Sequence, residues 1–193
     1  MTSSDGDAAL KAELLSYLQG ARETLVWKLD GLAEHDIRRP LTPTGTNLLG
    51  LVKHSTATHL GYFGEVFGRA SEAAGVPLVS GAAQFWATPE ESREDVVAAY
   101  RAAWFFADAT ITELPLDATG TVWWWGDDAV TLHHVMVHVT ADTQRHAGHA
   151  DILRELIDGA VGMLPGVDNL HIRDRDEQQR FVQEVQAAAD HFR

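Results

Sequence analysis

The chain has 193 residues, 45% of them hydrophobic, and its 28 acidic residues against 15 lysines and arginines give a formal net charge of −13. A surface this acidic repels phosphate backbones, so we expect no nucleic-acid partner. There is no cysteine, which excludes disulfides, a thiolate zinc site, an iron–sulfur cluster and a cysteine nucleophile.

Four long segments repeat apolar residues at steps of three or four, which is the spacing of amphipathic helices. Thr46 or Asn47 can cap the second of them, and Gly75 with Pro77 ends it. The predicted helices extend from about Ala8 to Leu32, from about Asn47 to Ala74, from Ser92 to Pro115, and from Thr131 to about Asp158 before Gly159.

Two connections, residues 75–90 and 116–130, are about 15 residues long, and the second contains three successive tryptophans. Connections of this length allow a crossover between helices. No segment shows a convincing strand pattern. The charged segment 173–193 is interpreted as a short helix packed on the outside. The sequence therefore predicts an all-α fold with one domain over 1–193, a four-helix bundle over about 8–159 and a C-terminal extension over about 160–193.

No apolar stretch approaches the ~20 residues that span a bilayer. The first residues also lack the charged start and apolar run of a secretory signal. We therefore expect a cytoplasmic protein that has no membrane partner.

Five of the ten histidines lie between His133 and His149, on the fourth predicted helix. At about 100° per residue, His146 falls in the middle of the apolar face, and Asp142 lies one turn before it. A carboxylate and an imidazole at this spacing can chelate one metal ion from adjacent turns. The alternative is a core histidine whose N–H meets Asp142, and the spacing leaves both interpretations open.

A third ligand would come from the second helix, which offers His54 and His59. The neighbours of His54 on its helix face are small: Gly50, Ala57, Thr58 and Gly61. They leave either room for an ion and its ligand or a very close contact. We therefore prefer His54 as the ligand, and we expect His59 to be packed or to lie at the rim.

Three segments resemble the DinB-like superfamily: GLVKH ending at His54, GYFGEVFG after it, and RHAGHADILRELIDG at the end of the fourth helix. The resemblance is closest to an actinobacterial branch, a domain of unknown function sometimes called mini-circle protein. It covers about Ala8 to Asn169. It implies a DinB-like four-helix bundle with a crossover connection, often a homodimer.

The resemblance also implies one divalent ion, held by a histidine of the second helix and a His/Glu–x3–His pair of the last. By position these ligands are His54, Asp142 and His146. The branch usually has glutamate at position 142. The shorter aspartate can hold the ion through water, or leave His149 to serve as the substitute ligand. Zinc, nickel and iron all suit this mixture of imidazole and carboxylate.

Characterised relatives activate a low-molecular-weight thiol, such as mycothiol or bacillithiol, for isomerisation or S-transfer. The resemblance therefore implies a metal-dependent enzyme that activates such a thiol, or water, toward a small organic substrate. A chain without cysteine would take its thiol from a cosubstrate. Two other functions stay open: a non-catalytic bundle that binds a small ligand or a metal, and a structural dimer with a vestigial site.

Further side chains are candidates for the substrate pocket: Thr58, Tyr62, Trp86, Trp123 and Arg145. Tryptophans near a metal site can line a pocket mouth, but they can equally seal the end of the bundle or a dimer contact. Tyr62 is a possible proton donor or a core residue. Arg145 can meet an anionic substrate or form an exposed ion pair.

Overall fold

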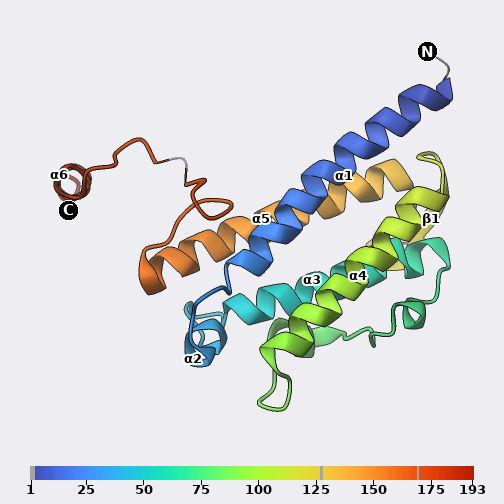
Figure 1. Cartoon of the computed structure of the whole chain (residues 1–193), viewed down its shortest axis with the longest axis horizontal. Coiled ribbons are helices and arrows are strands. Elements are labelled where there is room, and N and C mark those ends of the chain that lie inside the picture. Colours follow the sequence, from blue (N-terminus) through green and yellow to red (C-terminus); the bar gives the residue numbers. More distant parts are fainter. Residues whose placement is uncertain (1–2, 127, 169) are drawn as a thin grey trace.

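The computed structural model describes residues 3–126, 128–168 and 170–193, which are mostly helical (Figure 1). The long helices are α1 (Ser3–Trp27), α3 (Leu48–Phe63), α4 (Arg93–Glu113) and α5 (Leu132–Asp158), with a short α2 (Glu34–Arg38), a C-terminal α6 (Arg175–Asp190) and a two-stranded antiparallel sheet of β1 (Thr119–Val122) and β2 (Asp128–Thr131). The predicted all-α, DinB-like class is confirmed.

The four long helices pack in an order that differs from their order in the chain. α3 packs against both α4 and α5, while α1 packs chiefly against α5. α5 therefore contacts α1 and α3 more extensively than it contacts α4, the long helix that precedes it in the sequence. Leucines and aromatic rings from all four helices fill the space between them, among them Leu18, Leu25, Phe63, Tyr100 and Met136.

Capping side chains fix where the helices begin, as the sequence predicts. The side chains of Asn47, Ser92 and Thr131 accept hydrogen bonds from backbone N–H groups in the first turns of α3, α4 and α5. Each bond satisfies a donor that has no partner inside its helix. Gly159 ends α5 in the left-handed conformation that glycine favours.

The second helix is shorter than predicted. The α-helix ends at Phe63, and the rest of the predicted span contains two 3-10 helices, Glu65–Phe67 and Ser71–Ala74. A Cβ atom at Gly64 would clash with the Leu60 carbonyl and the Phe106 ring, and Gly68 adopts a left-handed conformation. These two glycines allow the chain to leave the helix early.

The connection 116–130 is not an open loop, as we had expected, but the hairpin of β1 and β2 with Trp123–Trp125 at its tip. The two strands have only four residues each, too few for the alternation of polar and apolar residues to stand out. This hairpin leads into α5, so it places the tryptophans at the end of the bundle.

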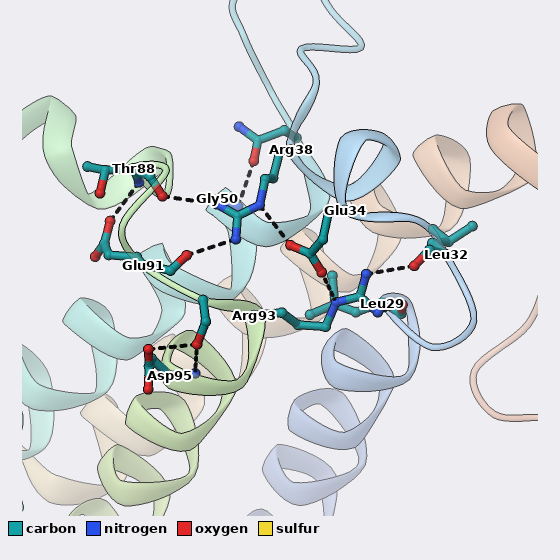
Figure 2. A network of polar contacts seen from close by, with 11 residues as sticks. Leu29, Leu32, Glu34, Arg38, Gly50, Thr88, Glu91, Arg93 and Asp95 are labelled. Carbon is teal, nitrogen blue, oxygen red and sulfur yellow. Dashed lines mark hydrogen bonds and ion pairs between the residues drawn. The ribbon is translucent and has the colours of Figure 1, made fainter.

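A network of arginines and carboxylates holds the segment before α4 (Figure 2). Arg38 donates to the carbonyl oxygens of Thr88 and Glu91 at 3.0 and 2.8 Å. The Glu34 carboxylate accepts from both Arg38 and Arg93. α2 is thereby tied to the end of the long connection 75–90 and to the first turn of α4.

α6 lies apart from the bundle (Figure 1), and none of its residues is buried. The predicted terminal helix therefore exists, but it is not packed on the outside of the bundle as expected. Its apolar side chains, Phe181, Val182 and Val185, are about half exposed. Among the described residues, no helix is long and apolar enough to cross a membrane.

Candidate metal centre

The structure brings His54, Asp142 and His146 together, with one potential ligand atom from each residue within 4.8 Å of the others. His54 comes from α3, and the other two come from successive turns of α5. All three side chains are partly buried. Asp142 Oδ1 and His146 Nε2 are 3.5 Å apart, and the rings of His54 and His146 meet edge to face. Two helices far apart in the sequence thus supply two imidazoles and a carboxylate to one point.

Two residues of the long connection 75–90 orient His54. Its Nδ1 lies 2.8 Å from Gln84 Oε1, and the ring of Phe85 stacks on it at 4.5 Å. The Gln84 amide nitrogen donates to the Gly81 carbonyl, which leaves its oxygen to accept from His54. His54 Nδ1 therefore carries the proton, and Nε2 keeps the lone pair that a metal would bind.

Gly50 allows this connection to reach α3. A Cβ atom at position 50 would clash with the backbone carbonyl of Phe85, and that carbonyl also accepts from Asn47 Nδ2 at 3.1 Å. Of the two uses that the sequence left open for the small residues near His54, Gly50 serves the close contact. That contact is with a loop backbone rather than with another helix.

Burial and charge favour the metal-binding forms of His54 and Asp142. Burial lowers the pKa of His54, which favours its neutral form. Burial alone would raise the pKa of Asp142, but the nearby His146, with smaller effects of His54 and His138, lowers it overall. A neutral imidazole and an ionised carboxylate are the forms that ligate a divalent cation.

The donor set fits a divalent metal ion. His146 Nδ1 is buried and has no hydrogen-bond partner among the described residues. The 3.5 Å between Nε2 and Asp142 is long for a hydrogen bond. An imidazole buried in this way carries a desolvation cost that coordination would remove. Imidazole with carboxylate is a ligand mixture that zinc, nickel and iron accept.

A cavity of about 350 Å³ opens beside the group, which is large enough for a small organic ligand. Its lining includes His54 and Asp142, and also the predicted pocket residues Thr58, Tyr62 and Trp123. Trp86 and Arg145 lie outside this lining. Trp86 follows the 3-10 helix in an extended backbone conformation and is 51% exposed. Arg145 is exposed on α5.

A second cavity of about 280 Å³ reaches the group from another side. His146 and His149 line it together with Thr44, Asn47 and Phe85. Phe85, which stacks on His54, belongs to this lining. His54 and Asp142 thus line the larger cavity, and His146 lines the smaller one.

The remaining histidines separate into different environments. His149 is exposed, and its ring is 5.6 Å from that of His146, so it lies outside the group of three. His59 is completely buried, as expected of a packed histidine. It accepts a hydrogen bond from Arg22 and donates one to the Ser55 carbonyl. His138 is partly buried, lines the larger cavity, and has a pKa lowered by burial.

Sequence reasoning missed Gln84 and Phe85, which orient His54. The length of the connection 75–90 marks it as a functional loop. The sequence of this connection has no periodicity that shows which residues turn toward α3. The 3-10 helix Gly81–Phe85 is instead positioned by a tertiary contact, the hydrogen bond from Asn47 to the Phe85 carbonyl.

The family model described as Mycothiol-S-transferase matches residues 13–159, which run from within α1 to the end of α5 and include the three clustered side chains. The chain belongs to this family. The predicted relation to the DinB-like superfamily is thereby confirmed. No curated protein matches the chain in sequence. The family implies a thiol cosubstrate and a small-molecule substrate.

Proposed function

We propose that this protein is a metal-dependent mycothiol S-transferase. One observation carries the proposal: in a chain that matches the mycothiol-S-transferase family, two imidazoles and a carboxylate from α3 and α5 meet where two cavities open. His54, Asp142 and His146 would hold the ion. A divalent ion bound there lowers the pKa of a thiol, so that the thiolate is available at neutral pH.

The two cavities suggest how two substrates are separated. The larger one, beside Trp123, takes the thiol, and the smaller one, beside His149, takes the electrophile. In the transfer the sulfur forms a bond to the electrophilic carbon, the bond from that carbon to its leaving group breaks, and the thiol proton ends on the leaving group or in solvent. Phe85, whose ring stacks on His54, lines the smaller cavity and would contact the electrophile there.

We assign the role of proton acceptor to His138. It lines the thiol cavity, and burial lowers its pKa, so its imidazole is neutral and can accept a proton at pH 7. Asp142, one turn further along α5, opposes that lowering and would stabilise the imidazolium that forms. His138→Gln should therefore retain the metal and lose turnover.

The test is the metal content of tag-free protein purified without chelator. We expect about one divalent ion per chain in the wild type, with loss of the ion in His54→Ala and His146→Ala. His149→Ala is the matched control, because this histidine lies on the same helix but outside the group. Retained metal in His146→Ala would refute the site, whereas loss of metal in His149→Ala would establish His149 as the substitute ligand.

Turnover then tests the reaction. The loaded wild type should join mycothiol to an electrophile, detected as loss of free thiol together with a product of the summed mass. If no electrophile in a panel of halides, epoxides and activated alkenes reacts, while the metal and the thiol both bind, the proposal of S-transfer fails.

A further inference from the structure

A third cavity, of about 180 Å³, lies between α3, α4 and the connection 75–90, and we call it the α3–α4 cavity. None of the three candidate metal ligands lines it. Ala57 and Val79 line both this cavity and the one beside Trp123, so the two cavities are neighbours. The proposed S-transfer gives the α3–α4 cavity no role.

The walls of the α3–α4 cavity are apolar and belong to the packed part of the fold. Ala57 of α3 and Val96 of α4 are buried. Val76, from the connection, packs against a cluster of buried side chains of α3 and α4. Pro77 follows it with a fixed φ angle, which stiffens this wall. Close-packed proteins hold few voids larger than a water molecule, so an apolar space of this size is suited to a ligand.

The volume indicates how large the ligand is. An apolar cavity of about 150 Å³ takes benzene. The α3–α4 cavity, at about 180 Å³, therefore has room for one aromatic ring and a short side arm. Ala57 and Ala99 line it from two different helices, and neither has a side-chain atom beyond Cβ to fill the space.

The charged residues of the lining favour a cation over an anion. They are Lys53, Glu91 and Asp95, which sum to one negative charge. The Lys53 ammonium is already engaged, because it donates to the Glu91 carboxylate at 2.8 Å and to the Trp86 carbonyl at 3.1 Å. An anionic ligand would therefore meet two carboxylates and a lysine that has its partner.

Asp95 supplies the free acceptor. It is exposed, so it lies at the rim of the cavity. Its Oδ2 accepts from the Ser92 hydroxyl at 2.6 Å, and Oδ1 has no partner among the described residues. A protonated amine at the end of a short side arm can donate to this oxygen while its ring lies among the apolar side chains.

We propose that the α3–α4 cavity binds a small organic ammonium ion, with an apolar ring between Ala57 and Ala99 and its charged nitrogen beside Asp95. This site is an addition to the proposed S-transferase centre. It involves none of the metal ligands, so its occupation does not depend on a bound metal ion.

The probe is benzylamine, which is protonated at pH 7, and its Kd is measured on the full chain by titration calorimetry. Toluene and benzoate are the neutral and anionic comparisons. We expect saturable binding of benzylamine, equal in metal-loaded and chelator-treated protein, about fivefold weaker binding of toluene, and still weaker binding of benzoate. Asp95→Asn should weaken benzylamine about fivefold and leave toluene unchanged.

Two variants locate the bound amine. Ala99→Leu fills the cavity and should abolish binding while the variant keeps the circular dichroism spectrum of the folded protein. Ala98→Leu is the matched control, because Ala98 is exposed on the same helix and does not line the cavity. Trp123→Ala changes only the neighbouring cavity and should bind benzylamine as the wild type does.

Each contrary result bears on this site alone. Absence of benzylamine binding, or binding that survives in Ala99→Leu but is lost in Trp123→Ala, would refute the α3–α4 site and leave the S-transferase standing. Toluene bound as tightly as benzylamine would refute the selection by charge. Benzylamine binding that Ala99→Leu abolishes would support the site even if no thiol is turned over.

Discussion

Replacing Gly50 by alanine tests how the long connection 75–90 is held against α3. A Cβ atom at this position would clash with backbone atoms of Phe85, which cannot rotate away as the end of a flexible side chain could. Gly148 on α5 is the matched control, because a Cβ there would have no heavy atom of another element within 4 Å. The same substitution is therefore crowded at one helical position and open at the other.

The magnitudes follow from two opposing effects. Glycine to alanine within a helix stabilises by about 0.5–1 kcal/mol, and this is the expected gain in Gly148→Ala. Forcing a methyl group into a filled space costs about 1–3 kcal/mol. The two variants should therefore differ by about 1–3 kcal/mol, which for a chain of this size is about 2–12 °C in Tm.

Thermal unfolding followed by circular dichroism measures this difference, and metal binding supplies a second readout. Displacing Phe85 would also move Gln84, which bonds His54, so Gly50→Ala should lose about 10–100-fold in metal affinity. Gly148→Ala should bind metal as the wild type does. If both variants were stabilised equally, the backbone of Phe85 would not be in close contact with Gly50, and the reasoning would be refuted.

Three further predictions concern stability, and one concerns assembly. Burial holds the pKa of His59 well below 6.5, so the unfolded chain binds a proton there that the folded chain does not, and stability falls as the pH drops below 6.5. His59→Gln should reduce this slope by up to about 1.4 kcal/mol per pH unit, measured by urea unfolding between pH 5 and 8. Ser92→Ala removes the cap of α4 and should cost about 1 kcal/mol of unfolding free energy, measured in the same way. Deletion of residues 171–193 should leave the Tm of the bundle unchanged, because no residue of α6 is buried, and a fall of several degrees would reveal a packing role. The predicted homodimer would appear as twice the chain mass in analytical ultracentrifugation.

Periodicity predicted the parts of the fold and of the site that depend on a single helix. Asp142 and His146 can be paired from sequence because a spacing of four residues fixes their relation on any α-helix. Ser92 and Thr131 likewise mark helix starts through local chemistry alone. The early end of α3 could not be found in this way, because Gly64 leaves the helix at a close contact with Phe106 of another helix.

The orientation of the site depends on contacts that no local pattern encodes. Nothing about Gln84 and Phe85 in the sequence shows that they turn toward His54. Their position follows from Asn47, which bonds the Phe85 carbonyl, and from the missing side chain of Gly50. Each of these contacts joins residues 30 or more positions apart in the sequence.

The connection that orients His54 is itself held in place at Thr88 and Glu91 by charged side chains of α2 and α3. Arg38 bonds the Thr88 and Glu91 carbonyls (Figure 2). The Glu91 carboxylate pairs with Lys53, the residue next to His54 on α3. Residues 85–91 are thus fixed to α2 and α3. A ligand held this way loses little conformational freedom when an ion binds, so the binding energy is not consumed in ordering the imidazole. The bundle brings the three candidate ligands together, and the anchored loop determines which nitrogen of His54 would face a metal ion.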